Sequence, residues 1–241
     1  RRVLSRYLFQ QYINAPESIY ENVYKLEPGA ALRFHKGEVE NWKYWDIRKV
    51  YAREIQNPVK DYQEAKEGLK ELLRKAVSER MIADVPLGSF LSGGYDSSLI
   101  TAIAQEQAQE PVKTFSIGFH EEKYNEAGYA RAVAQYLGTK HTEMYIDEKD
   151  MFDLVESIPK YYDEPFADSS EIATMMVSAL ARKDVTVALS GDGGDEFFCG
   201  YNIYERVAQA QKLDKLGGLV HGICSLPGLK QAGLENCLPF K

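Results

Sequence analysis

The chain has 241 residues, of which 44% are hydrophobic and 27% charged, a composition typical of folded globular proteins and not of disordered or collagen-like chains. The net charge of −7 gives no electrostatic signature of a nucleic-acid-binding surface. No apolar run approaches the roughly 20 residues that cross a bilayer, and the first residues lack the apolar centre of a signal peptide. We therefore expect neither nucleic acid nor membrane among the partners.

The cysteines argue against an oxidising compartment. Cys199, Cys224 and Cys237 are odd in number and form no CxxC pair, so a disulfide framework or a thiolate zinc site is not expected. A reducing compartment, the cytoplasm, is the expected location. The chain does not begin with Met, so we expect it to be part of a longer protein.

Residues 1–57 and the rest of the chain differ in pattern. The first part shows no helical period and predicts a short β-like stretch at 31–34, after a turn at Pro28-Gly29. From Lys60 onward, apolar residues recur at spacings of three and four up to Met81, which predicts an amphipathic helix. We place a domain boundary between these patterns, giving domains 1–57 and 58–241.

Between residues 85 and 189, short apolar runs alternate with helical periods. The predicted strands are 85–91, 114–119, 141–146 and 185–189. The predicted helices are 97–109, 125–137, 151–161 and 172–182. This alternation predicts an α/β fold with a parallel sheet covered on both faces, which binds ligands at the carboxyl ends of its strands.

The first loop to search follows the strand 85–91. It is Ser92-Gly93-Gly94-Tyr95-Asp96-Ser97-Ser98, in which adjacent glycines, hydroxyls and a helix start together suit an anion. It lacks the lysine of the Walker loop. Asp96 would repel a polyphosphate unless a divalent cation bridged them, so the loop points to a Mg²⁺-complexed nucleotide. An ordinary strand-to-helix turn with Asp96 as N-cap stays open at this stage.

A second loop of similar chemistry follows the strand 185–189. It is Ser190-Gly191-Asp192-Gly193-Gly194-Asp195-Glu196, whose carboxylates suit a hard cation and whose glycines allow close approach of a ligand. Parallel topology would bring both loops to one edge of the sheet. Asp96 and Asp195 would then hold Mg²⁺ on a pyrophosphate and stabilise its departure.

These motifs resemble a known family. Residues 92–98 are similar to the SGGxDSS loop of N-type ATP pyrophosphatases, and together with residues 189–196 they resemble the synthetase domain of glutamine-hydrolysing asparagine synthetases. Residues 114–119 and 163–170 extend the resemblance over about residues 58–205. It implies a Rossmann-like, adenine-nucleotide-binding fold with a parallel sheet. Residues 26–30 and 44–45 resemble the last strands of the family's glutaminase domain, so residues 1–57 are interpreted as its remnant.

The resemblance also implies a reaction. In that family the side-chain carboxylate of aspartate attacks the α-phosphate of ATP, pyrophosphate leaves, and ammonia displaces AMP to give asparagine. The implied pyrophosphate cradle is Ser92, Gly93, Gly94, Ser97 and Ser98, with Mg²⁺ on Asp96 and Asp195. The implied adenosine pocket is Leu91, Ile117, Ser190 and Gly191, and Asp192 would lie near the acceptor and ammonia. Asp96, Asp192 and Asp195 are thus the candidate catalytic residues.

Departures from the family pattern leave alternatives open. Asp192 stands where many asparagine synthetases have Glu, so another acceptor is an alternative, as in β-lactam-forming and carbapenam-forming synthetases of this fold. The glutaminase cysteine is missing from the start, and the family's active-site lysine is expected beyond Lys241. We therefore expect ATP·Mg²⁺ binding with little or no synthesis, and ammonia from a glutaminase domain outside this chain. A non-catalytic ATP-binding module and a homodimer also remain open.

Several polar residues have a structural interpretation. Asn125 is expected to cap a helix rather than to contact a nucleotide. Acceptor binding and helix capping stay equally open for Glu164, Asp168, Ser169 and Ser170. The four histidines show no metal spacing and are expected at the surface or in the core: His35, His120, His141 and His221.

Overall fold

The computed structural model describes residues 2–121, 125–168 and 170–211, and divides the chain into two compact units, 1–190 and 191–241. The residues discussed above that lie outside the described ranges are Ser169, His221, Cys224 and Cys237. The domain boundary expected near residue 57 stays a prediction.

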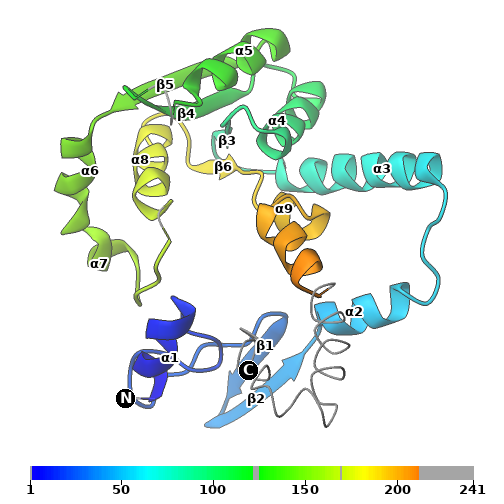
Figure 1. The fold of residues 1–241 in the computed structure, drawn as a ribbon, viewed down its shortest axis with the longest axis vertical. Coiled ribbons are helices and arrows are strands. Elements are labelled where there is room, and N and C mark those ends of the chain that lie inside the picture. Colours follow the sequence, from blue (N-terminus) through cyan, green and yellow to red (C-terminus); the bar gives the residue numbers. More distant parts are fainter. Residues whose placement is uncertain (1, 122–124, 169, 212–241) are drawn as a thin grey trace, which may run out of the picture. The chain divides into compact units, whose positions relative to one another are not determined.

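A parallel sheet of four strands forms the centre of the first unit, as predicted (Figure 1). The strands are β3 (Leu87–Phe90), β4 (Lys113–Phe119), β5 (Lys140–Ile146) and β6 (Val187–Leu189), in the order β5-β4-β3-β6. β3 pairs with β4 on one side and with β6 on the other, and each pairing is parallel. From β3 the chain adds β4 and β5 on one side and then returns to add β6 on the other side. The position between β3 and β6 is therefore a topological switch point, where sheets of this kind bind ligands.

The helices of this unit lie close to the predicted ranges. They are α3 (Tyr62–Arg80), α4 (Tyr95–Gln107), α5 (Ala127–Leu137), α6 (Glu148–Val155), α7 (Ile158–Tyr161) and α8 (Glu171–Ala181). The single helix expected at 151–161 is wrong, because the structure has α6 and α7 there. Pro159 lies at the start of α7, where it lacks the N–H that a continuous helix would need.

The helices cover the sheet through separate apolar clusters. Ile103 and Ala104 of α4 pack with Val77 of α3, and the Ser89 hydroxyl of β3 lies 2.9 Å from the Thr101 hydroxyl of α4. In another cluster, α8 packs on Phe115 of β4 through Leu180 and Ala181. The central strands β3 and β4 are the most buried of the sheet, as expected for strands that helices cover.

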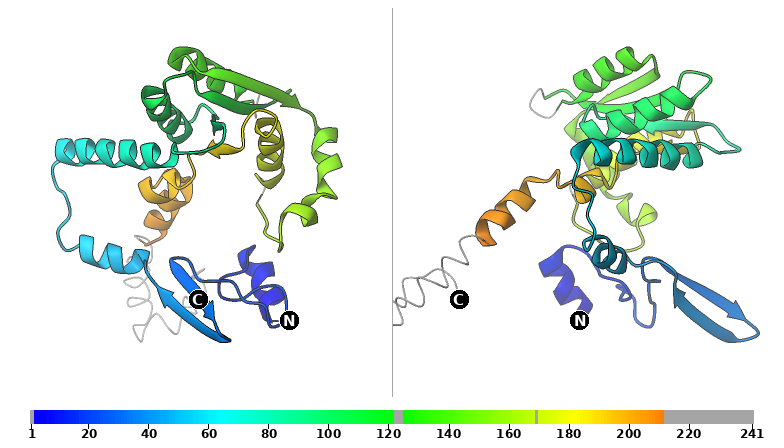
Figure 2. Two further views of the ribbon diagram at one scale, coloured as in Figure 1. Left: turned by 180° about the vertical axis from the view of Figure 1, so that it is seen from behind. Right: turned by 90° about the vertical axis from the view of Figure 1, so that its right-hand side faces the viewer.

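The N-terminal part contains α1 (Arg2–Gln10), the antiparallel ribbon β1 (Ala30–His35) and β2 (Glu38–Lys43), and α2 (Ile47–Glu54) (Figure 2). The stretch expected at 31–34 is confirmed as β1. The expectation of no helix here is wrong, because α1 and α2 form, although neither of them buries a residue. Asp46 begins α2 by accepting a hydrogen bond from Arg48 N.

The second unit contains α9 (Gly194–Phe198), and residues 202–211 are helical. α9 lies between two residues in the left-handed region, Gly193 with φ of 93° and Cys199 with φ of 59°. Among the described helices of both units, none is long and apolar enough to span a membrane.

Candidate functional site

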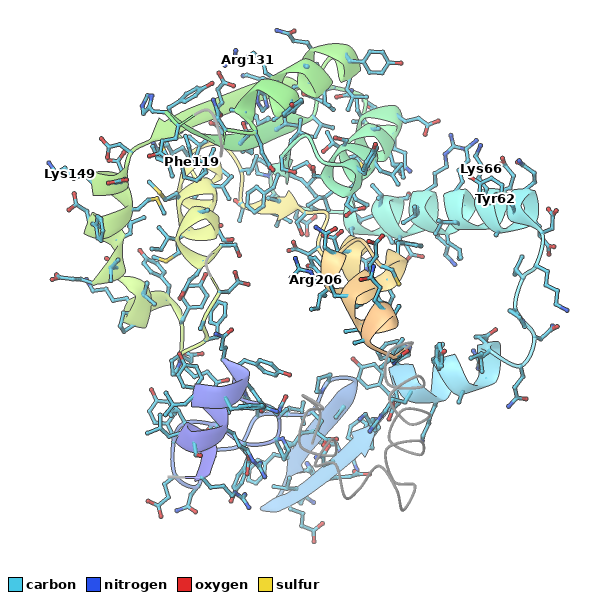
Figure 3. All side chains as sticks on the ribbon, in the orientation of Figure 1. Tyr62, Lys66, Phe119, Arg131, Lys149 and Arg206 are labelled. Carbon is cyan, nitrogen blue, oxygen red and sulfur yellow. The ribbon has the colours of Figure 1, made fainter. Side chains whose placement is uncertain are left out.

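The candidate site lies at the carboxyl ends of the central strands. Ser89 of β3 pairs with Leu189 of β6, so the chain leaves both strands at the same edge of the sheet. β4 ends at the same edge with Phe119, which is labelled in Figure 3. The first glycine loop, residues 92–94, and Ser190 thus emerge from neighbouring strands, as the parallel topology predicts.

Gly93 allows the first glycine loop to lie directly against α5. Its φ is +86°, and a Cβ built on it would lie 2.6 Å from Ala130 N and 2.7 Å from the carbonyl carbon of Tyr129. These neighbours are backbone atoms, so a side chain at this position has no room without moving α5. Gly94 is less confined, because its Cβ would meet only Ser92 Oγ, at 3.4 Å.

Serine hydroxyls hold the first glycine loop in shape. Ser92 N donates to Ser97 Oγ at 3.2 Å, and the two hydroxyl oxygens lie 2.9 Å apart. Gly94 N donates to Ser92 Oγ at 3.2 Å. Ser98 differs, because its Oγ is buried and has no hydrogen-bond partner among the described residues. A buried hydroxyl without a partner is unfavourable, so this atom is a candidate ligand contact.

The start of α4 is open to an anion. Gly94 is the N-cap and provides no side-chain hydrogen bond to this helix of 13 residues. The first N–H groups of a helix have no intrahelical acceptor, and they lie at the positive end of its dipole. Asp96 lies within the first turn and is not the N-cap, so the alternative of a plain capping aspartate is wrong.

These features fit a phosphate group. An uncapped helix start and a buried hydroxyl without a partner among the described residues supply donors but no fixed positive charge. Within the described ranges, no three or more His, Cys, Asp or Glu residues are grouped so that they could hold a metal ion. Asp96, which is half-buried, would therefore bind a cation only together with oxygens of a ligand or of another segment.

The residues expected around adenosine have different environments. Leu91 is 1% exposed, packs on Ala130 and Ala134 of α5, and donates its N–H to Phe115 O at 2.9 Å. Its side chain thus lies in the core, which leaves main-chain atoms for a ligand. Ile117 is only partly buried and lies beyond the last residue of β4 that pairs with β3, at the carboxyl edge.

The second glycine loop, residues 190–194, crosses the boundary between the two units. Ser190 closes the first unit, whereas Gly191, Asp192 and Asp195 belong to the second, so a joint Mg²⁺ site of Asp96 and Asp195 stays a prediction. Within the second unit, the Asp195 carboxylate lies against Gly200, where a Cβ would come 1.7 Å from Oδ1. Any larger residue than glycine at position 200 would displace this carboxylate.

Sequence reasoning missed Tyr201, which follows Gly200 and carries no motif of its own. Its hydroxyl donates to Glu196 Oε1 at 2.7 Å. This hydrogen bond raises the pKa of Tyr201 to about 12 and lowers the pKa of Glu196 below its usual value. Glu196 is therefore held ionised next to the predicted metal ligand Asp195.

Two capping expectations have clear outcomes. Asn125 Oδ1 accepts a hydrogen bond from Ala127 N at 3.1 Å just before α5, but the N-cap residue of α5 is Glu126, so the expectation of Asn125 as N-cap is wrong by one position. Asp168 accepts from Ser170 N at 2.8 Å and from Ser170 Oγ at 2.7 Å, just before α8, and these bonds lower its pKa. Asp168 thus shapes the turn that leads into α8.

The comparison with known families decides the relationship of this chain. The model of the asparagine synthase family matches residues 68–235, which include both glycine loops. The chain belongs to the asparagine synthase family. It is 44% identical over 193 residues to a putative glutamine-hydrolyzing asparagine synthetase 2 of Methanocaldococcus jannaschii, covering 79% of this chain and 36% of that protein. It is 32% identical over 251 residues to glutamine-hydrolyzing asparagine synthetase 1 of Bacillus subtilis, covering 100% of this chain and 38% of that protein.

The chain therefore spans little more than a third of the length of these relatives. Among solved structures, an NH3-dependent NAD synthetase from Campylobacter jejuni aligns with a TM-score of 0.37 and 12% identity, over 59% of this chain and 62% of that one. A likeness of this size is too weak to assign a fold. The α/β class rests on the sheet itself.

Proposed function

We propose that this chain is the nucleotide-binding, adenylating part of an ATP-dependent amide ligase that converts aspartate to asparagine. The observation that carries the proposal is the uncapped start of α4, which follows the Gly93 turn at the carboxyl end of the central strand β3. Membership of the asparagine synthase family and the names of the relatives support this choice of reaction.

In the first proposed step, a side-chain carboxylate oxygen of aspartate attacks the α-phosphorus of ATP. The bond from that phosphorus to the bridging oxygen breaks, and pyrophosphate leaves with the electron pair. Main-chain N–H groups of the first turn of α4 and the Ser98 hydroxyl donate hydrogen bonds to the pyrophosphate oxygens. Donors that are already in place stabilise the charge that grows on the leaving group.

Mg²⁺ is the proposed metal, held by Asp96 and Asp195 together with phosphate oxygens. When bound, it would offset the negative charge of the pyrophosphate and so make pyrophosphate a better leaving group. Ile117, Ser190, Gly191 and main-chain atoms of Leu91 are the proposed adenosine contacts.

In the second proposed step, ammonia attacks the activated carbonyl carbon, the bond from carbon to the AMP oxygen breaks, and nitrogen loses a proton. We propose that Asp192 lies near the acceptor and ammonia. The relatives are named as glutamine-hydrolyzing enzymes, so we propose that ammonia comes from a glutaminase domain to which residues 1–57 belong.

Titration calorimetry of this chain tests the nucleotide site. We expect ATP to bind more tightly with Mg²⁺ than without it, and expect Asp96→Ala and Asp195→Ala to remove that difference. Gly68→Ala is a matched control, because it lies in α3 and a Cβ there meets nothing within 4 Å. Equal ATP binding with and without Mg²⁺, unchanged in both aspartate variants, would contradict the metal assignment.

Exchange of labelled pyrophosphate into ATP tests the reaction, in the natural full-length protein. We expect exchange that depends on aspartate and is lost in Asp96→Ala. If pyrophosphate exchange required another carboxylic acid and did not occur with aspartate, the protein would be a synthetase with a different acceptor. ATP binding without exchange under any acceptor would indicate a non-catalytic nucleotide-binding module.

A further inference from the structure

The segment before α8 lies on the ligand side of the sheet. α8 packs on β4, and the residues after it return to the opposite edge, where Thr186 N donates to Pro86 O at 2.9 Å just before β3 begins. The start of α8 and the acceptor-side loop, which we define as residues 163–168, therefore lie toward the carboxyl edge.

The N-terminal part of the chain contacts the acceptor-side loop at three points. Tyr20 Oη donates to Asp163 O at 3.2 Å, and Ala167 N donates to Gln11 O at 2.8 Å. Between these two backbone contacts, the Lys25 ammonium pairs with the Glu164 carboxylate. Both ends of the loop and its middle are thus tied to a segment more than 130 residues earlier in the chain.

That segment is itself built as a closed loop. Lys25 N donates to Pro16 O at 2.9 Å, and the Lys25 ammonium also donates to Ile13 O. Ser18 Oγ donates to Val23 O at 2.6 Å, and both Ile13 and Ser18 are less than 9% exposed. Residues 11–25 therefore hold Lys25 in place by local contacts, as compact surface loops do.

The charges of the acceptor-side loop matter for an anionic substrate. Asp163, Glu164 and Asp168 give it three carboxylates, and Lys25 offsets one of them. The side chains of Lys25 and Glu164 are only 33% and 23% exposed, so solvent screens this pair less than a fully exposed one. Without Lys25, the Glu164 carboxylate would keep an unpaired negative charge. This charge would lie at the carboxyl edge of the sheet, where the carboxylate substrate is proposed to bind, and would repel it.

We propose that Lys25 is a positioning residue for the acceptor: it fixes the acceptor-side loop through Glu164 and cancels that carboxylate, so that the carboxylate substrate can bind. This inference rests on the proposed function, because it assigns the loop to the acceptor of the adenylation step. The effect is expected on the acceptor and only weakly on ATP, whose phosphates are assigned to the first glycine loop.

Steady-state pyrophosphate exchange in the natural full-length protein tests the assignment. We expect Lys25→Met to raise the KM for aspartate about tenfold and the KM for ATP less than about twofold, because the loss of a partly buried ion pair should cost more than that of an exposed pair and less than that of a fully buried one. Lys25→Arg should stay close to wild type, and Glu164→Gln added to Lys25→Met should restore most of the aspartate KM. The matched control is Arg74→Met, which removes the ion pair of Arg74 with Glu106 between α3 and α4.

A second measurement does not depend on activity. Hydrogen–deuterium exchange of the 241-residue chain should show faster exchange at residues 163–168 in Lys25→Met and not in Arg74→Met. An unchanged aspartate KM together with unchanged exchange at this loop overturns the inference. If the wild-type protein shows no aspartate-dependent pyrophosphate exchange, the proposed function fails, while faster loop exchange in Lys25→Met alone still supports the positioning contact.

Discussion

The first glycine loop, residues 92–94, and the second, residues 190–194, both follow a strand of the parallel sheet, and each contains a glycine in the left-handed region. The first leads into α4 of 13 residues, and the second leads into α9 of five residues. Their compositions are similar, yet their surroundings differ. A Cβ on Gly93 would meet backbone atoms of α5 at 2.6 Å, whereas a Cβ on Gly193 would meet only the Phe197 ring, at 3.6 Å.

This difference shows what preorganises an anion site. The first glycine loop is shaped by packing within the sheet unit, so the N–H groups of the first turn of α4 that follow it are in place before a ligand binds. The second has a hydrogen bond within its own short segment, from Gly194 N to Gly191 O at 3.2 Å. The first loop should therefore be the more rigid and the more sensitive to substitution.

Glycine-to-alanine variants should show the largest difference in stability between the two loops. Gly93→Ala combines a left-handed φ with a backbone clash, so we expect a loss of roughly 3 kcal/mol in the free energy of unfolding. Gly193→Ala has no clash and only the unfavourable left-handed φ, so the free energy of unfolding should fall by about 1 kcal/mol. Gly94→Ala should lower it by less than about 1 kcal/mol. Urea unfolding measures all three. Equal losses in Gly93→Ala and Gly193→Ala would show that packing on α5 does not distinguish the two loops.

Ser98→Ala separates ligand binding from stability in the first loop. The buried Ser98 Oγ has no partner among the described residues, so its removal should leave the free energy of unfolding unchanged or raise it. We expect the Kd for ATP to rise about fivefold, equivalent to one lost hydrogen bond of about 1 kcal/mol. Ser92→Ala is the contrasting variant, because it removes hydrogen bonds within the loop and should lower stability. Unchanged ATP affinity in Ser98→Ala would remove this hydroxyl from the proposed site.

Local pattern was enough to predict the sheet and most helices around the first glycine loop. The alternation of apolar runs with helical periods identifies the four strands of the parallel sheet. Buried parallel strands are short continuous apolar runs, whereas the helices between them have apolar residues at spacings of three and four. α1 and α2 were missed although apolar residues gather on one side of each helix, and neither helix buries a residue. Pro159 was the available signal for the break between α6 and α7.

The candidate site was only partly predictable, for a physical reason. The glycines and serines of the first loop indicate an anion site by composition, since backbone approach and hydroxyl donors are local properties. The contact of Gly93 with α5, the core position of Leu91 and the ion pair of Lys25 with Glu164 depend on residues far apart in sequence. No periodicity encodes such contacts.

The two units should also respond differently to pH, with the larger effect in the sheet unit. His141 of β5 lies between the Thr114 hydroxyl, 2.9 Å from Nδ1, and the Ser116 hydroxyl, 3.2 Å from Nε2, and burial lowers its pKa. The unfolded chain therefore binds a proton more readily, so this contribution to stability is present above about pH 6.5 and is lost as pH falls toward the lower folded pKa. Unfolding free energies measured between pH 5 and 8 in wild type and His141→Gln test this, and an equal slope in both would contradict it.

The smallest effect is expected in the second unit. Tyr201→Phe removes the donor to Glu196, so the pKa of Glu196 should rise toward its ordinary value. Because the folded pKa of Glu196 is lowered, its contribution to stability is present above the ordinary glutamate pKa and is lost as pH falls through the folded value. An NMR titration of the Glu196 side chain measures the change. A Glu196 pKa that does not move in Tyr201→Phe would show that this hydrogen bond does not hold the carboxylate.

The most direct test of the central claim is amide hydrogen exchange along the first glycine loop and the first turn of α4, with and without ATP and Mg²⁺. We predict that the nucleotide slows exchange at residues 93–98 in wild type, more strongly with Mg²⁺ than without it, and that Asp96→Ala removes the Mg²⁺-dependent part of this protection. Gly68→Ala should retain the protection. Binding of ATP with unchanged exchange at residues 93–98 would place the nucleotide elsewhere and contradict the proposed site.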